Sequence, residues 1–429
     1  MTKQERKRRD INYPHDRLIS VDYILIMFSS SVFSFMNHFF NAATPLYVQR
    51  LQGTTLQTGF VIMAYNLTAL VVRPVAGIIS DKTGRVKQLI MGAVICAASC
   101  FFFGLAGVIP LLAIIRSVNG IGFGMHSTSA GAAIADVLPK SRMAEGIGYF
   151  GLYSTLAQAL APGIALEIVK GDEISDYRTL FMLTACLGSA AIITNCFISY
   201  ERKRKKAAVN SETQFSENEK TQPHEMSSVE GPLPKTLFGF EYAVFAPVGV
   251  MVLMFAGTTC LMNYLSLFAR WRGFGNPAMY FIFSGIGILI SRLVFGKVVD
   301  KRGSDIVIIP GMAIMLISMA LIPLTGSLAA LIALGLPLGL AQGAVVPTFN
   351  SMLFKRCSAA RRGTASGAYF STIDIGIGLG APFLGAIADA SDYRFIYWVA
   401  AALVTLSLIL YVLFITDRRY NARHASSGL

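Results

Sequence analysis

The chain has 429 residues, of which 54% are hydrophobic and only 14% are charged, whereas soluble domains are about 25% charged. A water-soluble protein of this composition would lack the polar surface that keeps it dispersed. The net charge is +13, but the basic residues lie between long apolar runs, which excludes a basic nucleic-acid-binding domain.

Twelve apolar runs are each long enough to cross a bilayer, which takes about 20 residues. They predict an all-α integral membrane protein with twelve transmembrane helices. The predicted spans lie near residues 24–47, 56–79, 88–106, 109–131, 144–168, 177–199, 243–268, 278–299, 306–326, 327–352, 365–388 and 394–415.

Lysine and arginine are distributed unequally around these spans. If the N-terminus is cytoplasmic, six of the 37 lie outside, three (Arg73, Arg116 and Arg292) lie in or at the edge of a span, and the remaining 28 lie inside. This pattern predicts a multi-pass protein of a bacterial inner (plasma) membrane with both termini in the cytoplasm. The apolar run behind the basic N-terminal stretch is too long for a signal peptide, so we predict an uncleaved first span.

One long polar stretch, residues 201–240, divides the chain into two sets of six spans. Its low hydrophobicity and mixed charge predict a flexible cytoplasmic linker. The predicted units are an N-terminal tail (1–20), a first six-helix bundle (21–200), the linker (201–240), a second six-helix bundle (241–416) and a C-terminal tail (417–429).

The first span contains a polar stripe of Ser34, Asn37 and Asn41 at helical spacing, with His38 beside it. A histidine titrates in the range that a proton relay needs, although a neutral histidine that bonds to a neighbouring helix is an equally good interpretation.

The end of the second span opens a motif that returns in the second half of the chain. Within it we expect Gly77 to allow close helix packing, Gly84 to allow a sharp turn and Asp81 to face the N-terminus of a helix. The residues Arg73, Gly77, Asp81 and Gly84 recur 219 positions later as Arg292, Gly296, Asp300 and Gly303.

Two further repeats have nearly the same offset. Ser-Asp-Tyr-Arg at 175–178 recurs at 391–394, opening the last span of each half, and Tyr149 recurs 220 residues later as Tyr369. Six spans per half keep both halves in the same orientation, so they are parallel repeats. Such repeats place a substrate site between the halves near the middle of the membrane.

The fourth span contains a second polar stripe, because Arg116, Asn119, Phe123 and His126 share one helical face. An ionisable group inside a bilayer costs roughly 2.5–3.5 kcal/mol on insertion scales, which makes it a functional candidate. Arg116 could hold a substrate anion or exchange partners with a protonatable carboxylate. A structural ion pair is the alternative.

Asp374 in span eleven is the only acidic residue near the middle of a predicted span. Carboxyl groups in apolar surroundings can bind and release protons near physiological pH, so Asp374 is our candidate for proton coupling, with Arg116 as its expected partner. His38 and His126 are the next candidates. A carboxylate that is permanently paired to a cation is the alternative interpretation.

Other polar and aromatic side chains in the spans could line the substrate cavity between the halves, although interhelical hydrogen bonding explains any one of the polar ones and packing is the favoured interpretation for the tyrosines. The candidates are Asn37, Asn41, Asn66, Asn119, Tyr149, Tyr153, Gln158, Asn263, Tyr264, Gln342, Asn350 and Tyr369.

The motif at residues 77–87 resembles the signature loop between spans two and three of the major facilitator superfamily, and the resemblance covers essentially the whole chain. It implies a cytoplasmic gate formed by Gly77, Asp81, Gly84, Arg85 and the repeated Asp300. Span four, from Leu112 to Gly122, resembles a family motif associated with proton-coupled transport. The span-five motif of antiporters is degraded at 161–165.

We therefore expect a secondary active transporter of the drug:proton antiporter type, which exports an amphiphilic or zwitterionic molecule (a drug or a metal-chelating metabolite). A proton symporter that imports a small organic acid or sugar is the first alternative, and a receptor or scaffold without transport is the second. The chain has no nucleotide-binding P-loop and its six cysteines lack metal-ligand spacing. We expect no enzyme activity, cofactor, metal or nucleic-acid partner. The expected partners are substrate, protons and lipid, and the expected state is a monomer.

Overall fold

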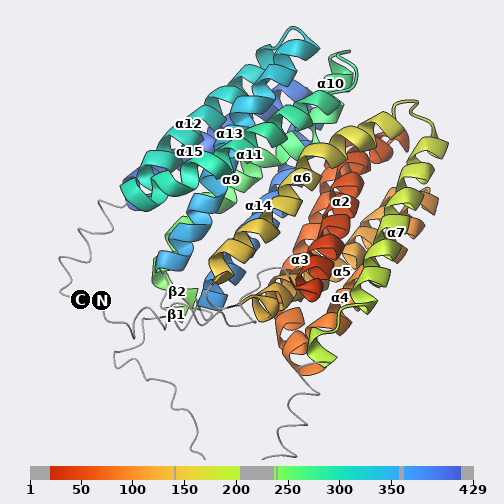
Figure 1. Ribbon diagram of the computed structural model, residues 1–429. Helices are drawn as coiled ribbons and strands as arrows, with labels where there is room; N and C mark the ends of the chain where they lie inside the picture. The colour runs from red at the N-terminus through yellow and green to blue at the C-terminus, as the bar shows by residue number, and fades with distance from the viewer. Residues whose placement is uncertain (1–19, 140–141, 203–235, 238–239, 357–361, 417–429) are drawn as a thin grey trace, which may run out of the picture.

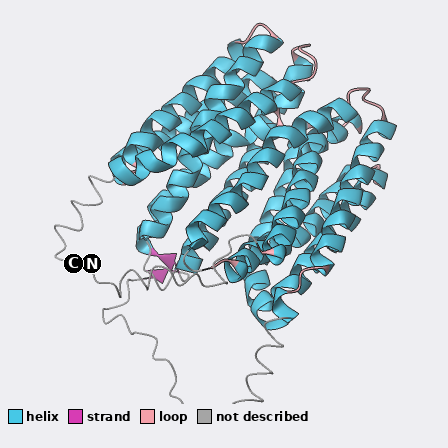
Figure 2. Ribbon diagram, viewed as in Figure 1, coloured by secondary structure: helices cyan, strands magenta, loops and turns pink. Residues whose placement is uncertain are grey.

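The computed structural model of the protein describes residues 20–139, 142–202, 236–237, 240–356 and 362–416. Figure 2 shows that these residues are almost entirely helical, apart from one very short hairpin at one end of the molecule. The tails and most of the linker predicted at 201–240 lie outside the described residues.

The first half of the chain forms six long helices: α2 (Val21–Arg50), α3 (Thr55–Thr83), α4 (Arg85–Leu105), α5 (Ile109–Val137), α6 (Met143–Ile168) and α7 (Ile174–Cys196). Local signals set several of their ends. Ser20 caps α2, and Thr54 with Gln57 forms a capping box at the start of α3.

The second half repeats this order with α9 (Tyr242–Asn263), the short α10 (Leu265–Trp271), α11 (Ala278–Arg302), α12 (Asp305–Leu321), the 3-10 turn η2 (Ile322–Leu324), α13 (Leu328–Arg356), α14 (Arg362–Ala390) and α15 (Tyr393–Phe414). Strands β1 (Thr236–Leu237) and β2 (Phe240–Glu241) precede it. The repeated tetrapeptide opens α7 and α15 as expected, and Asp392 caps α15 by accepting hydrogen bonds from the amides of Arg394 and Phe395.

The helices of the two halves pack in the same way. In the first half α3 packs on α5, α4 on α5 and α7, and α2 on α6 and α7; in the second, α11 packs on α13, α12 on α13 and α15, and α9 on α14 and α15. The halves meet where α3 contacts α14 and where α6 contacts α11. Figure 1 shows the halves as separate groups, red to yellow and green to blue.

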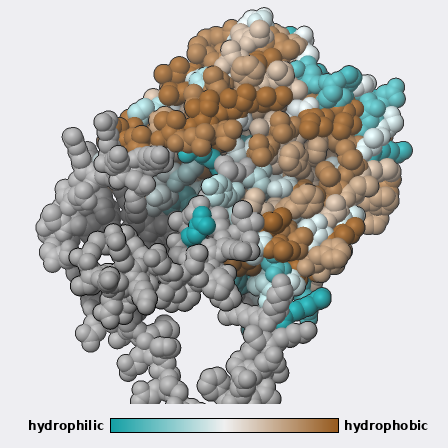
Figure 3. All heavy atoms as spheres, viewed as in Figure 1, coloured by the Kyte–Doolittle hydropathy of each residue, from teal (hydrophilic) through white to brown (hydrophobic). Residues whose placement is uncertain are grey.

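The outer surface is apolar. Large hydrophobic side chains such as Val71, Ile78, Ile114 and Leu293 are each more than 60% exposed, and Figure 3 shows hydrophobic residues over most of the visible face, with hydrophilic residues gathered toward its ends. Ten helices of the described chain are long and apolar enough to cross a membrane. The all-α membrane fold is therefore confirmed, whereas α5 and α6 do not meet both criteria, so the count of twelve spans stays a prediction.

Two ends of the molecule matter for the site. We call the end at which α2 and α9 begin and α7 and α15 finish the linker end. The opposite end, at which α3 and α15 begin, is the loop end.

Candidate functional site

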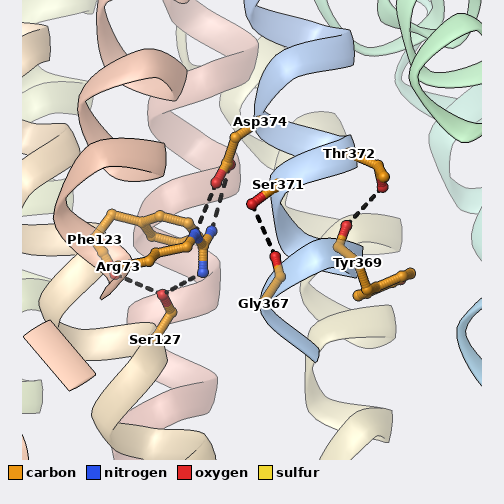
Figure 4. Close-up of polar contacts among 8 residues, drawn as sticks. All are labelled: Arg73, Phe123, Ser127, Gly367, Tyr369, Ser371, Thr372 and Asp374. Atoms are coloured by element: carbon orange, nitrogen blue, oxygen red, sulfur yellow. Dashed lines mark hydrogen bonds and ion pairs between the residues drawn. The ribbon is translucent and has the colours of Figure 1, made fainter. Parts of the chain in front are cut away.

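An ion pair joins the two halves near the middle of the helices. Arg73 of α3 donates from Nε to Oδ2 of Asp374 in α14 at 2.7 Å, and Nη2 lies 3.4 Å from Oδ1. Arg73 also donates to Ser127 of α5 at 3.0 Å, and its guanidinium lies over the rings of Phe123 and Phe370. Figure 4 shows Arg73 between Asp374, Ser127 and Phe123. The side chain of Asp374 is only 3% exposed, so the ion pair with Arg73 offsets most of the free-energy cost of burying its charge.

Arg116 lies in a separate enclosure within the first half. Its guanidinium donates to the side-chain oxygens of Asn119, at 3.1 Å, and Asn41. The rings of Phe40 and Tyr65 lie 4.4 and 4.3 Å from it. The residue is only 1% exposed. Amide oxygens and aromatic faces replace part of the water it would otherwise bind, whereas its Nε atom has no hydrogen-bond partner among the described residues.

The expected pair between Arg116 and Asp374 is therefore wrong. Asp374 pairs with Arg73, and no carboxylate among the described residues forms an ion pair with Arg116. The reason is packing: α5, which carries Arg116, contacts α2, α3 and α4, whereas α14 meets the first half along α3. Helix α3 thus supplies the cation that Asp374 reaches.

The remainder of the α5 stripe is also buried. His126 is 1% exposed and stacks on Phe33 with ring centroids 3.7 Å apart, and its Nε2 has no hydrogen-bond partner in the part of the chain that the structure describes. The Nδ2 atom of Asn119 also lacks a partner. These two atoms are polar groups enclosed without compensation, which is uncommon in structural cores.

The candidates of the first two spans have different surroundings. Asn37 accepts a hydrogen bond from Tyr65 at 2.8 Å, and His38 is half-buried. Asn66 is buried and bonds to its own helix, with its Cβ close to Gly378 of α14. Asn66 therefore faces the second half, whereas Asn37 and Asn41 form hydrogen bonds within the first half.

The remaining candidates are not gathered into one cluster. Tyr264 is fully buried and donates to the carbonyl of Ala381 at 2.7 Å, which ties the end of α9 to α14. Asn263 bonds within α9, Tyr153 meets Phe150 edge to face, and Tyr149 is 46% exposed. Gln158, Gln342 and Tyr369 are half-buried, and Asn350 has a buried oxygen without a hydrogen-bond partner.

The signature loop at the linker end is held by charges that sequence reasoning missed. Gly84 has φ +98°, as the predicted sharp turn requires, and Gly303 in the repeat has φ +88°. Glu201, which follows α7, accepts hydrogen bonds from the backbone amide of Arg85 at 2.5 Å and from that of Val86 at 3.4 Å. The carboxylate thus caps the N-terminus of α4, where negative charge is favoured.

The side chain of Arg85 extends this arrangement, because it pairs with Asp136 of α5 and donates to the carbonyl of Ala132 at 2.6 Å. The expected close approach at Gly77 is wrong for the helices that the structure describes, since a Cβ there would meet none of their atoms within 4 Å. The side chains of Asp81 and Asp300 lie outside the described residues, so their roles in a gate stay predictions.

The halves are also locked together at the loop end. Asp389 of α14 accepts hydrogen bonds from the amides of Thr55 and Leu56, at 2.8 and 2.7 Å, and so caps α3 of the other half. Tyr393 bonds to the hydroxyl of Thr55 at 3.0 Å. A Cβ on Gly59 would lie 2.4 Å from Pro382, so the helices are in direct backbone contact there.

The second interface between the halves is joined at the same end. Arg270, from the end of α10, pairs with Asp172 of the first half at 3.1 Å, and Asn276 donates to Glu167 at 3.1 Å. Both interfaces are therefore closed at the loop end. Among the residues that join the two halves, Asp374 was the one that the sequence singled out as a candidate. The sequence signal that could have identified Arg73 is its position at the start of the repeated motif.

An apolar body of many long helices, made of two similarly packed halves with an ion pair buried between them, is the architecture of membrane transporters built from parallel repeats. The chain belongs to the Major Facilitator Superfamily: the sequence profile of that family matches residues 25–381 and, in a second match, residues 249–428. It is a multi-pass membrane transporter of a small-molecule substrate and not an enzyme.

Individual relatives agree with this assignment. The chain is 24% identical over 393 residues to the Staphylopine export protein of Staphylococcus aureus strain Mu50, a match that covers 90% of this chain and 94% of the relative. It is 25% identical to Multidrug resistance protein 2 of Bacillus subtilis strain 168, over 60% of each chain. The crystal structure of a POT family transporter in complex with 5-aminolevulinic acid shares the fold, with a TM-score of 0.73 and 15% identity over 91% of this chain and 95% of that one.

Proposed function

We propose that the protein is a proton-coupled exporter of a small amphiphilic or zwitterionic molecule, a drug or a metal-chelating metabolite, that works by alternating access. The observation that carries the proposal is the ion pair between Arg73 and Asp374, which joins the halves across their interface. Export is favoured by the names of two relatives, a staphylopine export protein and a multidrug resistance protein.

The ion pair offers a direct way to couple protons to movement. When Asp374 is ionised it attracts the guanidinium of Arg73 and holds α14 against α3. A proton on Asp374 removes that attraction, and Arg73 then keeps only its bond to Ser127 and its contacts with the two phenylalanine rings. Protonation thus favours the state in which the halves separate at this level, which is the differential interaction that coupling requires.

The charge asymmetry of the sequence orients the transporter. We propose that the linker end, with both termini, lies in the cytoplasm of a bacterial cell and that the loop end faces outward. The loop-end contacts of Asp389 and Arg270 then close the outer entrance. The described conformation would be the one that receives substrate from the cytoplasm, as an exporter must. We further propose that the protein acts as a monomer in contact with lipid and has no nucleic-acid partner.

Growth inhibition by a panel of drugs and metal chelators, with and without the protein, would identify an exported compound. Uptake of that compound into inverted proteoliposomes under an imposed pH gradient then tests the coupling. We expect Asp374→Asn to lose gradient-driven transport while it keeps downhill exchange, and Glu173→Gln, which changes an exposed carboxylate, to behave as wild type.

Gradient-driven transport at the wild-type level in Asp374→Asn would contradict the assignment. His38 and His126 would then be the next coupling candidates. If the wild type itself showed downhill flux but no gradient-driven flux, the result would contradict proton coupling as a whole.

A further inference from the structure

Arg292 is the counterpart of Arg73 in the second half but has a different partner. Each arginine lies ten residues before the end of its helix, since α3 ends at Thr83 and α11 at Arg302. Arg292 donates from Nη1 to the backbone carbonyl of Gly151 in α6 at 2.7 Å. Among the described residues, its buried Nε atom has no hydrogen-bond partner and no carboxylate forms an ion pair with the residue.

No described carboxylate lies beside Arg292 as Asp374 lies beside Arg73. The 220-residue offset of the repeat places Ser154 of α6 where Asp374 lies in α14. The hydroxyl of Ser154 donates to the carbonyl of Gly151 at 3.0 Å, the same oxygen that Arg292 binds. Ser154 and Arg292 are therefore near neighbours, and a neutral hydroxyl stands in the place of a carboxylate.

As a result, the described side chains in the middle of the molecule carry more positive than negative charge. The described side chains there include three arginines, at positions 73, 116 and 292, against the single acid Asp374. Arg116 is enclosed by amide oxygens and aromatic rings and is 1% exposed. Arg292 is only half-buried, at the interface of α11 with α6.

We propose that Arg292 binds a carboxylate of the transported substrate. The substrate's carboxylate would lie beside Arg292 as Asp374 lies beside Arg73. It would accept two hydrogen bonds, one from the unpaired Nε and one from a terminal nitrogen of Arg292. This inference rests on the proposed function and narrows its substrate class to molecules with a free carboxylate. Cationic compounds that lack one are disfavoured, because they would meet an uncompensated positive charge.

The test measures binding to the purified full-length protein in detergent, with two acid–ester pairs as probes. Norfloxacin and ethylenediaminediacetic acid are a drug and a metal chelator with free carboxylates, and their ethyl esters block that group. We expect the wild type to bind at least one acid about 10- to 100-fold more tightly than its ester, as a charge-assisted hydrogen bond predicts. Arg292→Gln should bring that ratio close to one, and Arg292→Lys should restore part of it.

A second variant separates binding from folding. Ser154→Asp would give Arg292 an internal carboxylate, so the protein should fold normally while losing its preference for the acid. Arg178→Gln, which changes an exposed arginine in α7, is the matched control and should keep the wild-type ratio.

Three results would overturn the inference: a wild type that binds acids no better than esters, a wild type that binds none of the probes, or an equal loss of both ligands in Arg292→Gln. Transport under a pH gradient reports separately on the proposed function. Gradient-driven transport without a carboxylate preference would reject the role of Arg292 alone, whereas a carboxylate preference without gradient-driven transport would reject the coupled exporter alone.

Discussion

Removing either partner of the ion pair between Arg73 and Asp374 should destabilise the protein far more than removing both. In Asp374→Asn the guanidinium of Arg73 stays between the halves without a counter-charge, although its side chain is only 12% exposed. Breaking a buried pair in this way costs about 3–5 kcal/mol. The attraction itself is of the same order, because two charges about 4 Å apart interact with about 4 kcal/mol at an effective dielectric constant of 20.

A double-mutant cycle measures this coupling. The free energy of unfolding is determined in mixed detergent micelles for Asp374→Asn, Arg73→Gln and the combination of the two. The combined variant contains no unpaired charge, so it should be more stable than either single variant. Ser127→Ala is a control that removes one hydrogen bond from Arg73 and should cost about 0.5–1.5 kcal/mol.

Additive losses in the cycle would refute the reasoning. If the combined variant lost the sum of the two single effects, the residues would stabilise the protein independently, and the pair could not hold the halves together. A coupling energy below about 0.5 kcal/mol, the usual size for independent sites, would lead to the same conclusion.

Three further predictions concern the two ends of the molecule. Asp389→Ala should remove the cap on α3 that includes the Thr55 amide, at a cost of about 0.5–2 kcal/mol, and so lower the closed population at the loop end; unchanged distances between spin labels on α3 and α14 would contradict this. Gly84→Ala should cost about 1–3 kcal/mol in unfolding free energy because of its φ of +98°, whereas Gly77→Ala, where the added Cβ meets nothing within 4 Å, should be neutral or stabilising. Cysteines introduced at 201–240 should resist an impermeant thiol reagent in intact cells, and labelling there would overturn the proposed topology.

Local features of the chain could be predicted from its sequence. The turn at Gly84 depends on the conformational freedom of a single residue, and its repeat at Gly303 has the same left-handed φ. Helix positions followed from runs of apolar residues, and the start of α15 followed from the repeated tetrapeptide. Each of these depends on neighbours in the sequence, which a pattern displays directly.

The partner of Asp374 could not be predicted in this way. Arg73 and Asp374 are separated by 301 residues, and hydropathy gives the depth of a side chain but not the rotation of its helix about its own axis. Arg116 was preferred because it lies well inside a span. It is indeed fully buried, but α5 faces the interior of its own half.

The capping carboxylates were missed for a related reason. Glu201 directly precedes a run of basic residues, so its charge looks like part of a solvated segment. Asp389 lies near the end of a span. Each carboxylate accepts hydrogen bonds from the first turn of a helix far away in the sequence. Such pairings depend on the tertiary arrangement alone.

The cap that Asp389 places on α3 makes one helix end depend on the opposite half of the molecule. The amides of Thr55 and Leu56 bond to that carboxylate, and in a state that is open at the loop end they would face water instead. Their hydrogen–deuterium exchange should therefore accelerate whenever an entrance opens at the loop end. Two backbone amides of the unmodified protein could then report how often the entrance opens, without a label or a known substrate.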